Sequence, residues 1–132
     1  MMTYLFVALG GALGSVGRFA LSGAIARGLN EVFPWGTLVV NVSGCFIIGV
    51  FAILTGPDGR ILVPPDVRQF FMVGICGGYT TFSSFSLQTL ALAREGDFNR
   101  ASANVLASVL FCLLGVWLGS VAGLAINQMK GQ

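Results

Sequence analysis

The sequence predicts an all-α membrane protein with four transmembrane helices. Charged residues make up 9% of the 132 residues, against the roughly 25% usual in a soluble domain. Another 55% of the chain is hydrophobic, and the mean hydropathy is +0.87. Four separate stretches are apolar over the roughly 20 residues that a helix needs to cross a bilayer core. The short connections between them leave no room for a soluble domain, so we expect a single membrane domain over residues 1–132.

The four predicted spans follow one another closely along the chain. The first, residues 4–26, contains one charged residue, Arg18, and no Lys or Arg precedes it as in a signal peptide, so we expect it to be retained. The others, residues 35–55, 69–93 and 101–128, contain no charged residue. Small residues recur at four-residue spacing, a pattern that lets helices pack closely in lipid. They are Gly10 and Gly14, Gly74 and Gly78, and Gly115, Gly119 and Gly123.

Composition also excludes several classes of function. A net charge of +2 provides no basic surface for nucleic acid, so we expect no nucleic-acid partner. The chain has no histidine, and therefore lacks the imidazole of Ser-His-Asp and Cys-His catalytic sites and of the commoner zinc sites. The cysteines lie far apart inside apolar stretches, in a spacing typical of neither a disulfide framework nor a metal site. We interpret them as small packing residues, namely Cys45, Cys76 and Cys112.

Positive charges are balanced between the two sides of the predicted membrane domain. The side of the termini carries three, Arg60, Arg68 and Lys130. The other side also carries three, Arg27, Arg94 and Arg100. The positive-inside rule then gives almost no preferred orientation, so the chain is free to insert both ways and to pair with an inverted copy of itself. The alternative is that one helix dominates insertion, in which case a weak charge bias says nothing about orientation. Four helices hardly enclose a solvated path, so a transport function requires an oligomer.

Arg18 is the one charged residue inside a predicted span, where an arginine costs about 2.5 to 3.5 kcal/mol on insertion scales. One interpretation is a fixed positive charge that draws an anion into a vestibule. The other is a structural arginine that donates to backbone carbonyls at a helix kink near Gly14 and Gly17. All five Asp and Glu residues lie in connections or at helix ends, which argues against a cation pore or a proton-coupled exchanger.

The middle of the third span carries the most informative stretch, Gly77–Ser86, which reads GGYTTFSSFS. Two glycines and two β-branched threonines disfavour a continuous helix, and further hydroxyls follow. We predict a helix break at mid-membrane. Irregular backbone at that depth survives where it lines a cavity, and it exposes carbonyls that hold a small cation. The alternative is a kinked helix whose hydroxyls bond back to its own carbonyls.

Neutral donors and ring edges near this break are typical of an anion path. Phe82 and Phe85 project from one face, and the positive edge of an aromatic ring is favourable beside an anion. Asn41 lies on the second span, and Asn104 and Ser108 share a face of the fourth. Amides and hydroxyls replace the water of a small hard anion, whereas cation pores use carbonyls and carboxylates. Taken alone, the phenylalanines are more often packing residues, and the polar residues also serve as interhelical hydrogen bonds.

These residues resemble the small fluoride-specific ion channels of the Fluc (CrcB) family over nearly the whole chain. The resemblance is carried by Gly10–Gly14 running to Arg18, by Gly36–Asn41 and above all by Gly77–Ser86. It implies an antiparallel, dual-topology homodimer with two separate fluoride pathways at the subunit interface. It also implies a structural sodium ion at the dimer centre, held by backbone carbonyls of the two third-span breaks.

The resemblance implies roles for individual residues. The carbonyls of Gly77 and Thr80 would hold the sodium ion. Phe82 and Phe85 would match the phenylalanine ladder of the ion path, and Asn41 its pore asparagine. A further hydroxyl would come from a polar track on the fourth span. The expected fluoride pathway comprises Asn41, Thr81, Phe82, Ser83, Phe85, Asn104 and Ser108.

Three residues depart from the pattern of the family. Tyr79 stands where the family usually has a smaller or apolar residue such as Phe or Leu. Asn104 occupies a position that is often Tyr, and Cys112 one that can be Ser. An amide still donates to fluoride, whereas a thiol does so poorly, so the departures affect the far half of the path.

The sequence therefore predicts a passive channel through which fluoride leaves the cytoplasm, in the cytoplasmic membrane of a bacterium. Its partners would be fluoride, the lipid bilayer and a second copy of the chain. The alternative is a dual-topology small-molecule exporter, which would normally need an intramembrane carboxylate to couple protons to efflux. A membrane enzyme with Ser83 or Ser86 as nucleophile would lack a histidine, lysine or carboxylate base, so we expect no catalytic activity.

Overall fold

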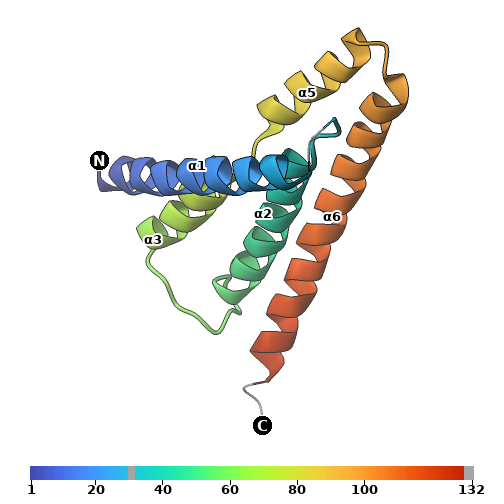
Figure 1. Cartoon of the computed structure of the whole chain (residues 1–132). Coiled ribbons are helices and arrows are strands. Elements are labelled where there is room, and N and C mark those ends of the chain that lie inside the picture. Colours follow the sequence, from blue (N-terminus) through green and yellow to red (C-terminus); the bar gives the residue numbers. More distant parts are fainter. Residues whose placement is uncertain (30–31, 130–132) are drawn as a thin grey trace.

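A computed structural model describes residues 1–29 and 32–129, and its regular elements are all helical (Figure 1). Glu31 and Lys130, which belong to the charge pattern of the sequence, lie outside the described residues. No strand occurs in the described part of the chain. The elements follow the order α1 (Met2–Leu29), α2 (Trp35–Leu54), α3 (Pro65–Gln69), the π-helix η1 (Phe70–Cys76), α4 (Gly77–Tyr79), α5 (Phe82–Arg94) and α6 (Phe98–Gln128).

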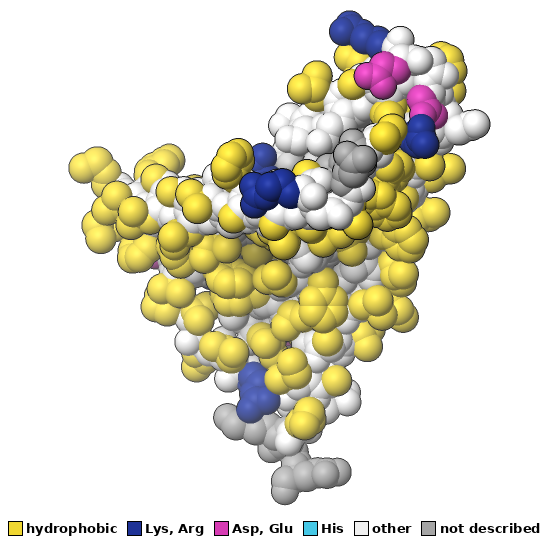
Figure 2. All heavy atoms as spheres, in the orientation of Figure 1, with side chains coloured by type: hydrophobic (Ala, Val, Ile, Leu, Met, Phe, Trp, Pro, Cys, Tyr) yellow, Lys and Arg dark blue, Asp and Glu magenta, His cyan; other side chains and the backbone are white. Residues whose placement is uncertain are grey.

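Four helical segments are long and apolar enough to cross a membrane, by length and composition. They are Met2–Leu29, Trp35–Leu54, Pro65–Arg94 and Phe98–Gln128. Large hydrophobic side chains cover most of the visible face, and a group of charged side chains of both signs lies where α5 meets α6 (Figure 2). Exposed apolar surface of this extent suits contact with lipid tails. The predicted all-helical fold with four long apolar helices is confirmed.

The third span is an interrupted helix that consists of several helical elements. It begins as α3, widens into the π-helix η1, tightens again in α4 and stops at Tyr79. Thr80 and Thr81 are extended, with φ/ψ of −81°/157° and −151°/114°, before α5 begins. The predicted interruption is therefore present, but it falls at the threonines, while Gly77 and Gly78 remain helical. β-branched residues adopt extended backbone readily, which explains why the helix stops there. The π-helix was not predicted.

Glycines determine how closely the spans approach one another. α1 lies against η1 and α4, and a Cβ added at Gly14 would clash with the carbonyl oxygen of Ile75. α2 lies along α6 (Figure 1), and a Cβ at Gly119 would clash with the carbonyl oxygen of Phe46. Only glycine lets these backbones meet, which is the packing role expected for the small residues.

The turn between α5 and α6 is built by two residues. Gly96 has a φ of 81°, a left-handed conformation that a residue without a Cβ adopts at little cost. Asp97 caps α6, because its Oδ1 accepts the backbone N–H of Arg100 at 3.1 Å. Leu92 and Ala101 are buried on either side of the turn, so α5 folds back onto α6. The turn thereby brings the second half of the third span beside the fourth.

Candidate functional site

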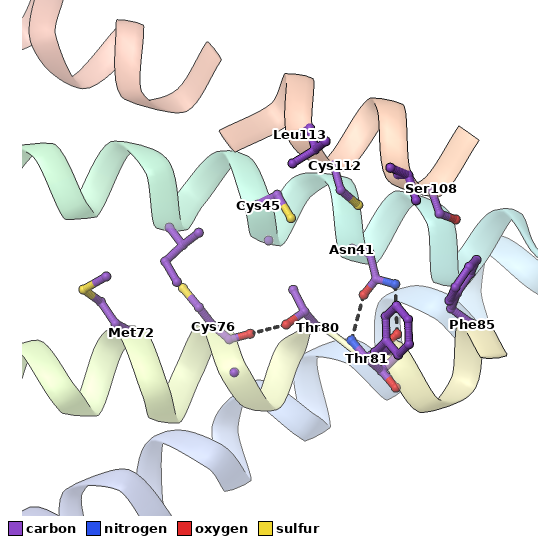
Figure 3. A pocket seen from close by; sticks show the side chains of 15 residues that line it. Asn41, Cys45, Met72, Cys76, Thr80, Thr81, Phe85, Ser108, Cys112 and Leu113 are labelled. Atoms are coloured by element: carbon purple, nitrogen blue, oxygen red, sulfur yellow. Dashed lines mark hydrogen bonds between the residues drawn. The ribbon is translucent and has the colours of Figure 1, made fainter. Parts of the chain in front are cut away.

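The extended residues of the third span are held by a side chain from α2. Asn41 is buried, and its amide meets the backbone of Thr81 twice (Figure 3). Its Nδ2 donates to the Thr81 carbonyl oxygen at 2.9 Å, and the Thr81 N–H donates to Oδ1 at 2.7 Å. The amide replaces helical hydrogen bonds that Thr81 has lost, which matters because unpaired backbone groups are costly away from water. One N–H of the amide remains for another acceptor, since an amide carries two donors.

The break frees carbonyl oxygens near the end of α4. In an unbroken helix the Thr81 N–H would donate to the Gly77 carbonyl, but it donates to Asn41 instead. The Ser84 N–H likewise donates to Thr81 Oγ1, at 3.2 Å, and not to the Thr80 carbonyl. Gly77 and Thr80 are the residues predicted to hold a cation. Their carbonyls have lost their helical donors, as that role requires.

Most predicted site residues surround one cavity of about 480 Å³, which we call the central cavity. Its walls come from α2, the third span and α6 (Figure 3). Predicted residues that line it are Asn41, Gly77, Thr80, Thr81, Phe82, Phe85 and Ser108. Ser83, Asn104 and Arg18 are not among its lining residues, and neither is any Asp or Glu. The structure thus brings together neutral donors, ring edges and freed carbonyls from three spans.

Phe82 and Phe85 form a ring pair at the start of α5. Their centroids lie 5.2 Å apart, and the ring planes are tilted by 53°. Phe85 is 8% exposed, whereas Phe82 is 78% exposed, although both line the central cavity. Packing within the chain therefore fixes the inner ring. The outer ring is an apolar surface that the described part of this chain leaves largely uncovered.

A series of hydrogen bonds joins α6 to the start of α5. Ser108 Oγ donates to Asn104 Oδ1 at 3.5 Å, and Asn104 Nδ2 donates to Thr89 Oγ1 at 2.9 Å. Thr89 Oγ1 in turn donates to the carbonyl oxygen of Phe85 at 2.8 Å. Asn104 is only 2% exposed. It connects two residues that line the central cavity, Ser108 and Phe85, through one buried and two partly buried hydrogen bonds.

Arg18 contacts the break from α1. Its Nε donates to the Gly78 carbonyl oxygen at 3.2 Å, and Ser15 Oγ donates to the same oxygen at 3.4 Å. Arg18 also lines a second cavity of about 460 Å³, whose other polar side chains are Ser15, Ser22, Thr37, Thr81, Ser84 and Gln88. The structure therefore shows features of both interpretations of this arginine. It donates to a backbone carbonyl, and it is the one charged group lining a polar cavity.

Comparison with known proteins places the chain in a family. Residues 5–120 match the family described as "CrcB-like protein, Camphor Resistance (CrcB)". The chain belongs to the CrcB family. A relative from Rhodospirillum rubrum named "Fluoride-specific ion channel FluC" is 67% identical over 127 residues, which cover 96% of this chain and 98% of the relative. Relatives of the same name from Opitutus terrae and Methylocella silvestris are 62% and 55% identical, covering 99% and 98% of this chain and 99% of each relative.

Membership of the CrcB family makes this chain a multi-pass membrane protein of an ion-channel family and not an enzyme. The resemblance drawn from the sequence is confirmed. Its departures from the CrcB pattern have defined places in the structure. The Tyr79 hydroxyl lies 2.8 Å from Ser43 Oγ and ties the end of α4 to α2. Cys112 lines the central cavity one turn beyond Ser108.

Two polar residues of α5 were missed by sequence reasoning. Thr89 carries the hydrogen bond from Asn104, and Gln88 lines the second cavity. Gln88 Oε1 is buried and has no hydrogen-bond partner among the described residues. Gln88 follows Ser84 by four residues, so helical periodicity continued past the Gly77–Ser86 stretch could have found it. Ser83, which was predicted, is exposed and lies 3.2 Å from Thr81 Oγ1 through its hydroxyl.

Proposed function

We propose that this chain forms a passive, fluoride-selective channel through which fluoride leaves the cytoplasm of a bacterial cell across its cytoplasmic membrane. The observation that carries the proposal is the central cavity, whose lining brings the amide and hydroxyl groups of Asn41, Thr81 and Ser108 beside two phenylalanine rings and contains no carboxylate. Identity of up to 67% with proteins named fluoride-specific ion channels supports fluoride as the permeant ion.

The chemistry of the cavity suits a small, strongly hydrated anion. N–H and O–H donors replace the water that fluoride gives up, and they cost less to keep in lipid than a fixed positive charge. The edges of the Phe82 and Phe85 rings add weak positive potential along the same wall. A carboxylate 4 Å away would oppose the anion by about 4 kcal/mol at an effective dielectric constant near 20. The absence of acids from the lining therefore favours anions over cations.

The conducting unit in this proposal is an antiparallel homodimer with two pathways. Phe82 lines the central cavity yet is 78% exposed, so one chain alone leaves this wall uncovered. An inverted second copy would cover it, and two-fold symmetry would then repeat the pathway once in each chain. The balance of positive charges between the two sides supports insertion in both orientations.

A structural sodium ion on the two-fold axis completes the proposal. Carbonyl oxygens are hard ligands that fit such a cation, and those of Gly77 and Thr80 have lost their helical donors. The described residues contain no group of three or more His, Cys, Asp or Glu that could hold a metal. Two carbonyls from each chain would hold the ion and keep both breaks in place. Exchange of sodium for a bulky organic cation is expected to lower the thermal stability of the purified dimer.

The proposal is tested by fluoride efflux from liposomes reconstituted with the purified protein. A fluoride electrode follows release after a voltage-neutralising ionophore is added, and chloride-loaded vesicles run in parallel. Rapid fluoride release with chloride retained is the expected result. Release no faster than from protein-free vesicles, by protein that remains a monodisperse dimer, would overturn the channel assignment. Equal release of chloride would overturn its selectivity.

A further inference from the structure

The central cavity contains a set of sulfur atoms for which the proposed channel has no use. Cys45 from α2, Cys112 from α6, and Met72 and Cys76 from η1 all line it (Figure 3). They come from three segments that are far apart in the sequence, and all three cysteines are free thiols. Thiol and thioether sulfur are soft ligands, which select soft metal ions over hard ones. The fold therefore gathers soft donors that the sequence spacing does not reveal.

Two of these thiols lie on α2 and α6, which pack along each other. Cys45 and Cys112 both line the central cavity and are half-buried, whereas Cys76 is buried. The helices that carry them are held close, because a Cβ added at Gly115 would already lie 3.0 Å from the Val42 carbonyl oxygen and 3.7 Å from the Cys45 Cβ. The separation of the two thiols is thus set by backbone packing between α2 and α6. Such preorganisation favours a bridging ligand over attachment to one thiol.

We propose that Cys45 and Cys112 form a two-coordinate binding site for a soft divalent cation, with Hg²⁺ as the probe. HgCl₂ would exchange its two chlorides for two thiolates, and the two thiol protons would leave with the chlorides as HCl. The product, a mercury bis-thiolate, carries no net charge. A neutral complex brings no net positive charge into a cavity whose lining residues include no Asp or Glu to pair with it.

Occupancy of this site has a consequence that rests on the proposed function. Asn41 and Ser108 line the same cavity as the thiol pair, so bound mercury would lie in the wall of the anion path. It would fill part of the space and replace polarisable thiols by a rigid link between α2 and α6. Mercury is therefore expected to block fluoride efflux.

The site itself is tested by mass spectrometry of the full-length dimer, a readout that does not depend on transport. With one equivalent of HgCl₂ per chain, wild type is expected to gain one mercury, lose two protons and keep no chloride. The matched control Cys76→Ala should do the same. Cys45→Ala and Cys112→Ala should instead keep a chloride on singly attached mercury, and the serine variants serve if either alanine variant fails to fold. No bridged mercury in wild type, or equal bridging in Cys112→Ala, would overturn the site.

Fluoride efflux then tests whether bound mercury blocks the channel. The ratio of fluoride efflux with and without HgCl₂ is measured within each variant, so differences in basal rate do not enter. Wild type and Cys76→Ala are expected to slow by about tenfold or more and to recover with a dithiol, because the pore wall is occupied. Cys45→Ala and Cys112→Ala should respond far less. Bridging with unchanged efflux would overturn the block but keep the site, whereas absent efflux without mercury would count against the channel alone.

Discussion

Asn41 pairs with both backbone groups of Thr81, at donor–acceptor distances of 2.9 and 2.7 Å. A side-chain amide offers the same donor and acceptor as a peptide group, which is why one asparagine replaces two lost helical partners. The residue expected at the pore is therefore also the residue that stabilises the break. Two measurements report these roles: the free energy of unfolding reports the role in the break, and fluoride efflux reports the role in the pore.

Replacement of Asn41 by leucine is expected to destabilise the protein by about 2 to 6 kcal/mol. The change keeps the number and branching of side-chain heavy atoms but leaves the Thr81 N–H and carbonyl unpaired, and each buried unpaired group costs about 1 to 3 kcal/mol. Thr37→Val is the control, since it lies one turn earlier on α2 and is equally buried, at 8% exposed. Unfolding in detergent, followed by circular dichroism, measures both variants. Equal losses for the two would contradict a specific role for Asn41.

Asn41→Asp tests conduction in protein that still folds. The carboxylate accepts the Thr81 N–H but loses the donor to the Thr81 carbonyl, and it brings a negative charge to the central cavity, where it opposes an anion. Fluoride efflux per folded dimer is expected to fall by at least about tenfold, since a few kcal/mol of repulsion exceeds the 1.4 kcal/mol of a tenfold change. Wild-type efflux from this variant would remove Asn41 from the path.

The two phenylalanines should differ in stability but not in transport. Phe85→Ile changes a buried ring and is expected to cost up to about 1.5 kcal/mol, whereas Phe82→Ile changes a ring that is 78% exposed in one chain. Both variants lose a ring edge from the cavity wall, so both should conduct fluoride more slowly. Liposome efflux and thermal unfolding on the same preparations check this. Unchanged efflux in both variants would disprove the ring assignment.

Arg18 can be tested for charge and hydrogen bonding in turn. Arg18→Lys keeps the positive charge of the second cavity but removes the Nε donor to Gly78, while Arg18→Met removes both. If the charge gathers anions, the lysine variant should retain most of the fluoride efflux and the methionine variant should lose it. If the hydrogen bond alone matters, both variants lose stability to a similar extent, by about 1 kcal/mol or more.

Glycine pairs on α1 test the close packing against the third span. A Cβ at Gly14 would clash with the Ile75 carbonyl oxygen, whereas a Cβ at Gly11 would meet nothing within 4 Å. Gly14→Ala is expected to cost about 1 to 3 kcal/mol through overpacking, and Gly11→Ala to leave the free energy of unfolding nearly unchanged. Thermal unfolding compares them. A Gly11→Ala variant that unfolds as easily as Gly14→Ala would argue that a second chain, and not this one, fills the space.

The start of α6 should depend on pH. The backbone N–H and then the guanidinium of Arg100 hold the pKa of Asp97 below its ordinary value. A lowered pKa in the folded state means that the cap stabilises fully above the unfolded pKa of about 4, and that this is lost as pH falls through the folded pKa. The hydrogen-exchange protection of the first turn of α6, taken relative to the intrinsic exchange rate at each pH, should therefore fall in acid. Asp97→Asn keeps a neutral cap, so its protection should not vary with pH.

Much of the fold could be predicted from the sequence, because membrane spans depend on local composition. Four apolar stretches and the threonine break follow from residue types alone. The π-helix η1 could not be predicted, since no residue type in Phe70–Cys76 marks π-helical backbone. The role of Thr89 was missed for a related reason. It depends on which faces of α5 and α6 meet, and periodicity describes one helix at a time.

Apart from the hydroxyl of Thr81, which accepts the Ser84 N–H, the groups that complete the break come from earlier in the chain. Asn41 and Ser43 belong to α2, and Arg18 and Ser15 to α1. Synthesis proceeds from the N-terminus, so both helices are already in the membrane when the third span leaves the ribosome. The peptide groups that the break leaves unpaired can then hydrogen-bond to side chains of α1 and α2, so the segment need not remain without hydrogen-bond partners in lipid. The order of the helices in the gene is thus also a workable order of assembly.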